Sequence, residues 1–325
     1  MGVSSGPAPR SAHRATLSVR PRSVGEQEQR LDDATELPPG EQVIHGKVYE
    51  IVDRVGEGGM GKVYRAYEPS MDRYVALKVL KLDVPESAQR RFRREAVVAA
   101  NFSHPNLSRV LDVGTTGRKM QWMTMEYLRG RDLGEIIDSG TKVAFPLLID
   151  MMCQTLDALD YVHMRGITHC DVKPDNIFVT RDPYNRRIVV IKLIDFGICR
   201  ATTPKLETQE ELSGDPRYMA PECTVLDGPV DARTDFYSLG VTMYECLTGV
   251  HPFEEWLDGD VRELLRMHCR VQPPTPSSRL DPSTRPRLAA AIDDVFACAC
   301  AKDPADRFAN AMAMKKAVAG LLDVT

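Results

Sequence analysis

The sequence predicts an α+β protein in which a mainly β front lobe is joined to a mainly α rear lobe, with a natural crevice between them. Short β-like runs separated by turns that contain Gly or Pro dominate the chain as far as Glu126. Beyond Leu128, long segments with helical spacing of apolar residues take over. The 325 residues are 43% hydrophobic and 27% charged, an ordinary composition for a globular protein with a substantial core.

The front lobe is predicted to be an antiparallel meander that is followed by one helix and two more strands. The predicted strands lie at residues 48–55, 62–67, 74–80, 108–113 and 120–126. A helix is expected over residues 85–101, because Phe92, Ala96 and Ala99 recur at helical spacing. Glu95 lies beside that apolar stripe, so we expect it on the inward face of the helix.

The rear lobe is predicted to be mainly helical. Helices are expected at residues 147–165, 233–248, 288–301 and 309–322. The single β-like interruption consists of residues 177–179 and 188–194, which we expect to pair as a hairpin. The sequence contains no internal repeat.

Charge and cysteine content exclude several functional classes. Lys and Arg number 42 against 46 Asp and Glu, so the net charge of 42 − 46 = −4 lacks the basic excess of a dedicated nucleic-acid binder. The eight cysteines show no repeated spacing, which predicts reduced thiols, a cytoplasmic location and no zinc site. The chain has no apolar secretory segment and no run of about 18 uncharged apolar residues, so we expect no membrane segment.

The first 46 residues differ from the rest of the chain and are predicted to be a disordered tail. They are rich in Ser, Pro, Gly, Arg and Glu and have almost no periodic apolar positions. Residues 1–30 carry a net charge of +3, and residues 31–46 carry −4. Such a tail could dock on its own protein, but a solvated linker is the favoured interpretation.

Gly56, Gly58 and Gly61 occupy positions 1, 3 and 6 of a glycine-rich turn, where the backbone could lie against phosphate oxygens. Such a turn has three phosphate-binding interpretations: a dinucleotide-binding turn, a P-loop, or a β-hairpin lid over a nucleotide. The first two need a helix directly after the glycines, but residues 63–67 are β-like. Val63 also stands where a P-loop needs Ser or Thr. The lid is therefore favoured, and a glycine-rich hairpin without function is the alternative.

Residues farther along the chain support the nucleotide lid. Lys78 lies in an apolar strand, and Glu95 follows 17 residues later, so a Lys–Glu pair could hold the ammonium near phosphate oxygens. Phosphoryl transfer also needs an orienting carboxylate, a positive charge at the γ-phosphoryl group and oxygen ligands for magnesium. Side chains of these types occur on either side of the predicted hairpin, at Asp171, Lys173, Asn176 and Asp195.

Together these motifs resemble those of a eukaryotic-type (Hanks-type) protein serine/threonine kinase, and they are most similar to the bacterial members of that family. The resemblance covers residues 47–310, and the motifs occur in order. It implies the bilobal protein-kinase fold, with a small β-rich N-lobe that carries one key helix and a larger α-helical C-lobe. The implied divisions are a tail at 1–46 and a kinase domain at 47–325, with its N-lobe at about 47–126, its hinge at about 125–128 and its C-lobe at about 129–325.

The resemblance implies an ATP site in the crevice. The implied contacts are Gly56, Gly58 and Gly61 over the phosphates, Val63 and Ala76 above the adenine, Phe178 beneath it, Lys78 at the α- and β-phosphates, the main chain of Glu126 and Leu128 beside the adenine, and Asp132 at the ribose. Met125 would be the gatekeeper of this hinge. The implied cofactors are ATP and Mg²⁺, with Mn²⁺ as an alternative metal.

The resemblance also implies the catalytic roles. Asp171 would accept or orient the proton of the substrate hydroxyl, and Lys173 would stabilise the γ-phosphoryl group. Asn176 and Asp195 would bind the metal ions, and Glu95 would pair with Lys78. Three further residues are expected to brace the C-lobe, namely Asp235 under the catalytic loop and Glu222 in a pair with Arg307.

Two positions depart from the family pattern. Cys170 replaces the arginine that precedes the catalytic aspartate in many relatives and receives an activation-loop phosphate. We therefore expect catalysis to depend only weakly on phosphorylation of that loop, whose candidate acceptors are Thr202, Thr203, Thr208 and Ser213. Asp215 stands where relatives usually carry Thr, so its carboxylate is expected either to lean away from Asp171 or to raise the pKa of that residue.

The favoured function is therefore a protein serine/threonine kinase with a non-Arg-Asp catalytic loop, His169-Cys170-Asp171, that acts on protein Ser/Thr hydroxyls and autophosphorylates. A pseudokinase or scaffold that binds nucleotide without efficient transfer is the alternative, and a small-molecule kinase is a third class. We expect protein substrates and self-association for autophosphorylation, with no nucleic acid and no membrane as partners. The sequence leaves open the substrate, the upstream signal, the role of the tail and whether the chain is a fragment.

Overall fold

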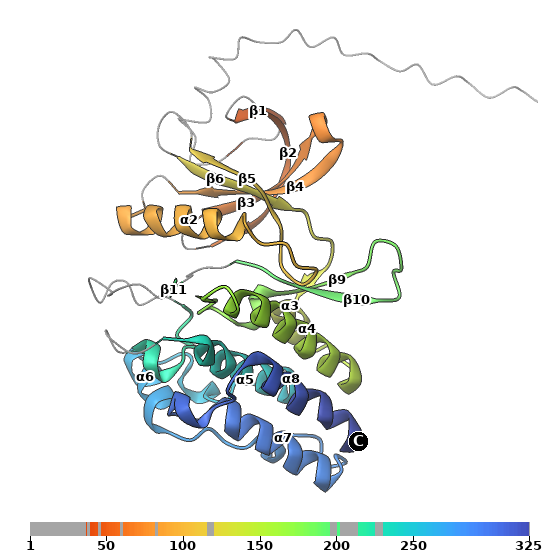
Figure 1. The fold of residues 1–325 in the computed structure, drawn as a ribbon, viewed down its shortest axis with the longest axis vertical. Coiled ribbons are helices and arrows are strands. Elements are labelled where there is room, and N and C mark those ends of the chain that lie inside the picture. The colour runs from red at the N-terminus through yellow and green to blue at the C-terminus, as the bar shows by residue number, and fades with distance from the viewer. Residues whose placement is uncertain are drawn as a thin grey trace, which may run out of the picture.

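A six-stranded antiparallel sheet lies at one end of the computed structural model, and a helical lobe lies at the other (Figure 1). The structure describes residues 37, 40–44, 47–58, 61–81, 84–115, 120–195, 200–201, 214–224 and 230–324. The sheet has the strand order β1-β2-β3-β4-β6-β5. Its strands are β1 (Gly40–Ile44), β2 (Lys47–Glu57), β3 (Gly61–Glu68), β4 (Arg73–Leu80), β5 (Val110–Thr115) and β6 (Gln121–Glu126).

The helix α2 (Glu86–Ala99) is the helix of this upper lobe that covers the sheet (Figure 1). Phe92, Ala96 and Ala99 are buried on one side of α2, as their helical spacing predicted. Glu95 is buried on the same side and is only 5% exposed. The packing of three apolar neighbours therefore brings a carboxyl group toward the crevice.

The lower lobe is mainly helical. Its helices are α3 (Leu133–Asp138), α4 (Phe145–His163), α5 (Ala232–Thr248), α6 (Val261–Arg270), α7 (Pro286–Ala299) and α8 (Ala311–Gly320). Five short strands cross its upper surface, β7 (Arg131–Asp132), β8 (Ile167–Thr168), β9 (Ile177–Arg181), β10 (Val189–Leu193) and β11 (Arg200–Ala201). The antiparallel β9–β10 pair is the predicted hairpin, and it projects from the body between the lobes (Figure 1).

Two apolar clusters stabilise the two faces of the upper sheet. One cluster joins α2 to the core of the lower lobe and contains Phe92 and Met123 together with the buried faces of α4, α5, α7 and α8. The other contains Tyr49, Tyr64 and Trp122 and is closed by Leu37. The main-chain N–H of Leu37 donates to Tyr64 Oη at 3.1 Å. Burial of these large side chains supplies most of the driving force for folding of the sheet.

The α+β expectation and its main elements are confirmed, but helices α3 and α6 were not predicted and the N-terminal boundary differs. Strand β1 pairs along its whole length with β2, and Leu37 is 4% exposed, although both lie within the segment expected to be disordered. The ordered sheet therefore begins before residue 47, because β2 has a free edge that β1 pairs with. The rest of the predicted tail, residues 1–36, lies outside the described residues.

Candidate active site

The glycine-rich turn joins β2 to β3 at the edge of the crevice. Gly58 N–H donates to Gly61 O at 2.9 Å, and the two residues between them lie outside the described part of the chain. A Cβ on Gly61 would lie 2.5 Å from Val79 O, so the close approach of β4 requires glycine there. A Cβ on Gly58 would meet nothing within 4 Å. Protein packing thus explains Gly61, and it does not explain Gly58.

One face of the sheet carries the side chains that were assigned to the nucleotide. Val63 is the register partner of Lys78, and Ala76 lies two residues before Lys78, so these three side chains share a face. Met125 on β6 pairs with Ala76 and belongs to the same face. Phe178 comes from β9 in the lower lobe and is half-buried. The assigned adenine and phosphate residues therefore come from both lobes.

Lys78 binds Asp195 in this structure, and it does not form the expected pair with Glu95. Lys78 Nζ donates to Asp195 Oδ1 at 2.7 Å, and the two residues are 117 positions apart. Burial opposes the charge on Lys78, but the Asp195 carboxylate outweighs it, so the pKa of Lys78 is raised. Burial likewise opposes the charge on Asp195, yet Lys78 lowers its pKa below the usual value. The predicted Lys78–Glu95 pair is wrong for this conformation, because the carboxylate of Asp195 binds the ammonium group of Lys78 instead.

Glu95 is left as a buried carboxyl group. Its Oε1 atom has no hydrogen-bond partner in the described structure. Burial raises the pKa of Glu95 to about 8, against a smaller lowering by Lys78. Glu95, Met123, Met125 and Asp195 line a cavity of about 20 Å³, which is room for about one water molecule. Glu95 is therefore mostly protonated at neutral pH in this conformation.

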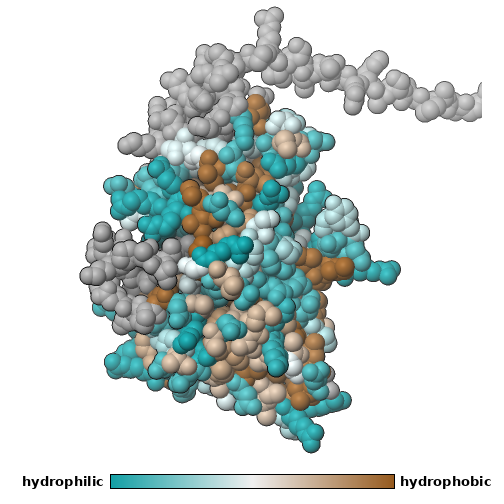
Figure 2. All heavy atoms as spheres, in the orientation of Figure 1, coloured by the Kyte–Doolittle hydropathy of each residue, from teal (hydrophilic) through white to brown (hydrophobic). Residues whose placement is uncertain are grey.

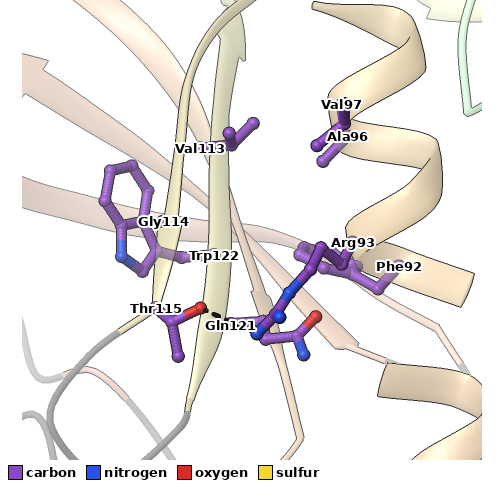
Figure 3. Close-up of a pocket in the computed structure, with 9 residues that line it drawn as sticks. All are labelled: Phe92, Arg93, Ala96, Val97, Val113, Gly114, Thr115, Gln121 and Trp122. Carbon is purple, nitrogen blue, oxygen red and sulfur yellow. Dashed lines mark hydrogen bonds between the residues drawn. The ribbon is translucent and has the colours of Figure 1, made fainter. Parts of the chain in front are cut away.

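A groove separates part of α2 from strands β5 and β6 of the sheet. Phe92, Ala96 and Val97 face Val113 and Trp122 across a groove of about 200 Å³ (Figure 3). Arg93 reaches over the groove, and its Nη2 donates to Thr115 Oγ1 at 3.5 Å. The groove thus lies between α2 and strands β5 and β6, next to the buried contacts that position Glu95.

Asp171 is held by several contacts at the top of the lower lobe. Its Oδ1 accepts from Asp215 N at 3.0 Å, and its Oδ2 accepts from Asn176 Nδ2 at 2.9 Å. Asn176 Nδ2 also donates to Asp171 O at 2.8 Å, so one amide group fixes both ends of the aspartate. Lys173 Nζ lies 3.4 Å from Asp171 Oδ2. The structure therefore brings Asp171, Lys173 and Asn176 together, three of the six side chains that were assigned catalytic or metal-binding roles.

Asp235 anchors the catalytic loop from below. Its carboxylate is fully buried and accepts from the main-chain N–H groups of His169 and Cys170, both at 2.8 Å. His163 Nε2 lies 2.7 Å from the same carboxylate. Cys170 has φ = 63°, a left-handed conformation that costs a non-glycine residue about 1 kcal/mol or more. The expected tether by Asp235 is confirmed, and it offsets the strain at Cys170.

The carboxylate of Asp215 turns away from Asp171 toward a cation that the sequence reasoning missed. Arg217 forms a two-pronged contact with Asp215, from Nε to Oδ1 at 3.0 Å and from Nη2 to Oδ2 at 2.7 Å. Lys173 Nζ lies 3.4 Å from Asp215 Oδ2. Burial raises the pKa of Asp215, but the Arg217 contact dominates and lowers it. Of the two expectations for Asp215, the structure supports the one in which its carboxylate leans away from Asp171. The Asp215-Pro216-Arg217 sequence was the signal that could have predicted the contact with Arg217.

The hinge is fixed from behind by an ion pair that was also not predicted. Glu126 Oε1 accepts from Lys192 Nζ at 2.7 Å and from Arg109 N at 3.0 Å. The side chain of Glu126 thus points to the back of the hinge. Asp132, assigned to the ribose, caps α3 by accepting from Glu135 N at 2.7 Å. Only part of its carboxylate is available for a ribose.

A buried ion pair braces the lower lobe, as expected. Arg307 Nη1 and Nη2 donate to Glu222 Oε1 and Oε2 at 2.7 and 2.8 Å. Thr234 Oγ1 donates to the same Glu222 Oε1 at 2.7 Å. Both charged side chains are almost fully buried, so each depends on the other for compensation.

The donor set of the site suits a hard metal ion that is held partly by a ligand. Within the described ranges, no group of three His, Cys, Asp or Glu side chains could hold a metal ion by itself. Asn176 and Asp195 offer one amide oxygen and one carboxylate, and magnesium is usually bound by one or two carboxylates together with phosphate oxygens and water. The four candidate acceptors of the activation loop lie outside the described residues.

Comparisons with known proteins agree with this geometry. A protein-family model for the protein kinase domain matches residues 49–318. Serine/threonine-protein kinase pkn3 of Myxococcus xanthus is 36% identical over 274 residues, which are 82% of this chain and 48% of the relative. PknB of Mycobacterium leprae is 34% identical over 274 residues, which are 82% of this chain and 40% of the relative. The chain thus spans about half or less of the length of these curated relatives.

A solved structure gives the same result for the fold. The kinase domain of Mycobacterium tuberculosis PknI superposes with a TM-score of 0.66 at 30% identity, covering 88% of this chain and 100% of that domain. Among the helices that the structure describes, none is both long enough and apolar enough to cross a membrane. None of the seven described cysteines forms a disulfide bond.

Proposed function

Because the chain belongs to the protein kinase domain family, we propose that it transfers the γ-phosphoryl group of ATP to Ser and Thr hydroxyls of proteins. The observation that carries this proposal is the joint placement of Asp171, Lys173 and Asn176 in one hydrogen-bonded group across the crevice from Lys78. Lys173, two residues after Asp171, is the arrangement that the family resemblance assigns to Ser/Thr kinases.

We propose that the nucleotide binds on the shared face of the sheet. Val63 and Ala76 would contact the adenine from above and Phe178 from below, with the main chain of Glu126 and Leu128 beside it. The open space around Gly58 supports a phosphate position under the glycine-rich turn, because no atom of the described residues lies within 4 Å of a Cβ placed there. Gly56 and Gly61 would shape the same turn, and Asp132 would offer its remaining oxygen to the ribose.

We propose Asn176 and Asp195 as the residues that hold the metal ions. Asn176 directs its amide N–H groups to Asp171, which leaves its carbonyl oxygen as a ligand. When bound, Mg²⁺ or Mn²⁺ would neutralise phosphate charge at the transferring group. Asp195 must then release Lys78, which would move to the α- and β-phosphates and toward Glu95. We therefore propose that the described conformation is a resting one, in which Lys78 neutralises the carboxylate that would bind the metal.

The chemical step would use the contacts already present around Asp171. Its carboxylate is fixed by Asn176 and by the Asp215 main chain, so it can orient the substrate hydroxyl and accept its proton. Lys173 lies between the carboxylates of Asp171 and Asp215, and their charges raise its pKa despite its burial. A fully charged Lys173 can follow the γ-phosphoryl group through the transition state.

A phosphoryl-transfer assay tests the proposal. The chain is incubated with radiolabelled ATP and magnesium, and label on Ser and Thr of the chain and of a Ser-containing peptide is measured. We expect transfer that is lost in Asp171→Asn and Asp195→Ala and kept in Asp258→Asn, a matched change at an exposed carboxylate. Nucleotide binding without transfer by the wild-type chain would instead identify a nucleotide-binding scaffold and overturn the proposal.

The wider assignments are proposals of the same kind. We propose one catalytic domain that starts with β1 and runs through α8, protein substrates, and self-association during autophosphorylation. A cytoplasmic location is proposed from the scattered, free cysteines.

A further inference from the structure

A large groove lies along the hinge, where it shares Glu126 and Leu128 with the proposed nucleotide site. It has a volume of about 1200 Å³ and is lined by the hinge, the β9–β10 hairpin and the segment between α3 and α4. The hairpin projects from the body (Figure 1 and Figure 2), and several of its residues line the groove. Among the described residues that line it, none is a proposed phosphate-binding or catalytic side chain. The groove therefore adjoins the nucleotide site at the hinge, but its described lining contains none of the side chains proposed for phosphoryl transfer.

The lining of this groove, called here the hinge groove, is strongly basic. Its cations are Arg129, Arg131, Lys142, Arg181, Arg186 and Lys192. The carboxylates among its described lining residues are those of Glu126 and Asp182, so the lining carries 6 − 2 = +4, whereas the whole chain carries −4. The positive charge is thus local, and it stands out against the rest of the molecule.

Both carboxylates of the hinge groove are already engaged in local contacts. Glu126 is bound by Lys192 at 2.7 Å. Asp182 Oδ1 accepts the N–H groups of Tyr184 and Asn185 in the tip of the hairpin, at 2.8 and 2.7 Å. They compensate only part of the surrounding charge.

Several cations of the groove are available to a ligand. The side chains of Arg129, Arg131 and Arg186 are exposed, and each forms no ion pair with any residue that the structure describes. Arg181 donates to Arg186 O at 3.0 Å, which uses one of its donors within the hairpin. These guanidinium groups can therefore bind carboxylates with two parallel hydrogen bonds.

The floor of the groove is aliphatic. Leu147, Val179, Val189 and Val190 line it and are half-buried, so each presents part of an apolar surface. A surface of this kind buries Leu- or Val-sized side chains. It offers few exposed aromatic rings for stacking nucleic-acid bases, and the chain has no overall basic excess.

We propose that the hinge groove docks an extended, acidic segment of a protein substrate, with aliphatic side chains on the valine floor and carboxylates on the arginines. The proposal rests on the kinase function proposed above, because the docked segment would belong to the protein that is phosphorylated. The groove lies away from Asp171, so docking would raise the local concentration of the acceptor without touching the reacting atoms. It would lower the KM of substrates that carry such a segment and leave kcat unchanged.

Binding is tested first, without catalysis. The probe is a short fluorescein-labelled peptide of alternating Glu and Leu, and its binding to the full chain is followed by fluorescence anisotropy at low and high salt. We expect saturable binding that Arg129→Glu/Arg186→Glu weakens by about tenfold or more and that added salt also weakens. Ala144→Trp, which fills the groove from an exposed position without changing charge, is expected to weaken binding too. Arg262→Glu/Arg270→Glu, the same charge change on exposed residues of α6, is the matched control and should bind as the wild type does.

A second measurement joins the groove to catalysis. A Ser-containing peptide is compared with the same peptide joined through a Gly/Ser linker to the Glu/Leu segment. We expect the extended peptide to have a lower KM in the wild type and in the α6 control, and this advantage to disappear in Arg129→Glu/Arg186→Glu. The short peptide should be phosphorylated equally by all variants. If no variant transfers phosphate, the kinase proposal fails. The binding data still show whether the groove binds the acidic peptide.

Three results would overturn the docking proposal. One is equal binding of the Glu/Leu peptide to the groove variants and to the α6 control. Another is tighter binding of polyuridylate than of the peptide at the same sites, which would assign the groove to nucleic acid. The third is a dimer of the wild-type chain, seen by sedimentation, that the groove variants abolish, which would assign the groove to a second copy.

Discussion

Replacing Glu95 by Gln should stabilise the resting structure at neutral and alkaline pH. Gln has nearly the same shape as protonated Glu, and Glu95 is 5% exposed with one carboxyl oxygen lacking a partner in the described structure. Burial raises the pKa of Glu95 from 4.5 to about 8. Between these values the unfolded chain binds fewer protons than the folded one, so the stability of the wild type falls as pH rises.

The size of the effect follows from the pKa difference. Each pH unit between the two values costs about 1.4 kcal/mol, so the wild type loses about 3 kcal/mol between pH 4.5 and pH 7. Glu95→Gln cannot lose a proton and escapes this loss. The free energy of unfolding of the variant, minus that of the wild type, should therefore rise by about 4 kcal/mol between pH 5 and pH 8.

Urea unfolding at a series of pH values measures this difference. Other titrating groups cancel, because they are common to both proteins. Glu86→Gln is the matched control, since Glu86 lies on the same helix and is exposed, and its difference should stay flat with pH. If the free energy of unfolding changes with pH in the same way for Glu95→Gln and the wild type between pH 5 and pH 8, the reasoning is refuted. The rate of phosphoryl transfer should fall in the same variant. The uncharged side chain of Glu95→Gln cannot neutralise Lys78 when that lysine leaves Asp195.

Three further predictions concern bracing, nucleotide binding and activation. Arg307→Ala leaves the Glu222 carboxylate buried without its partner and should lower the free energy of unfolding by about 3–5 kcal/mol in urea titrations, whereas an unchanged midpoint would contradict a structural role. Gly58→Ala should leave the melting temperature unchanged and weaken ATP analogue binding, while Gly61→Ala should lower the melting temperature because of its 2.5 Å approach to Val79 O; calorimetry on both variants checks the pair. Phosphatase-treated chain should phosphorylate a peptide nearly as fast as autophosphorylated chain, and an activation of about 100-fold, or about 2.7 kcal/mol, would contradict the role assigned to Cys170.

Local patterns allowed most of the fold to be predicted from the sequence. The spacing of Phe92, Ala96 and Ala99 correctly placed α2, and alternating β-like runs correctly placed β2, β3 and β4. Strand β1 was missed, because the surrounding residues have the composition of a disordered tail and β1 is stabilised by pairing with β2. Helix α6 was also missed, although Asp260 caps it.

The site was harder to predict where it depends on competition between distant residues. The residue types and their order identified Asp171, Lys173 and Asn176, and these lie together as expected. Whether Lys78 binds Glu95 or Asp195 depends on the position of α2 and on a residue 117 positions away, so spacing alone could not decide it.

The segment from Gly214 to Thr224 shows why a weak dependence on phosphorylation is physically reasonable. Tyr218 Oη donates to Glu245 Oε2 at 2.6 Å, and Ser238 Oγ donates to Tyr218 O at 2.8 Å. His251 Nε2 lies 2.7 Å from Arg217 O. Arg217 itself holds Asp215 beside the catalytic group, so fixed side chains supply anchors of the kind that a loop phosphate on an arginine would otherwise provide.

With Cys170 in place of that arginine, a phosphate in the loop would have no guanidinium at the residue before Asp171. The contacts of Arg217 and Tyr218 do not depend on any modification, so the substrate-facing side of Asp171 can be ordered without one. In the proposed mechanism, the exchange of Lys78 from Asp195 would then accompany the binding of nucleotide and metal and would need no phosphate on the loop.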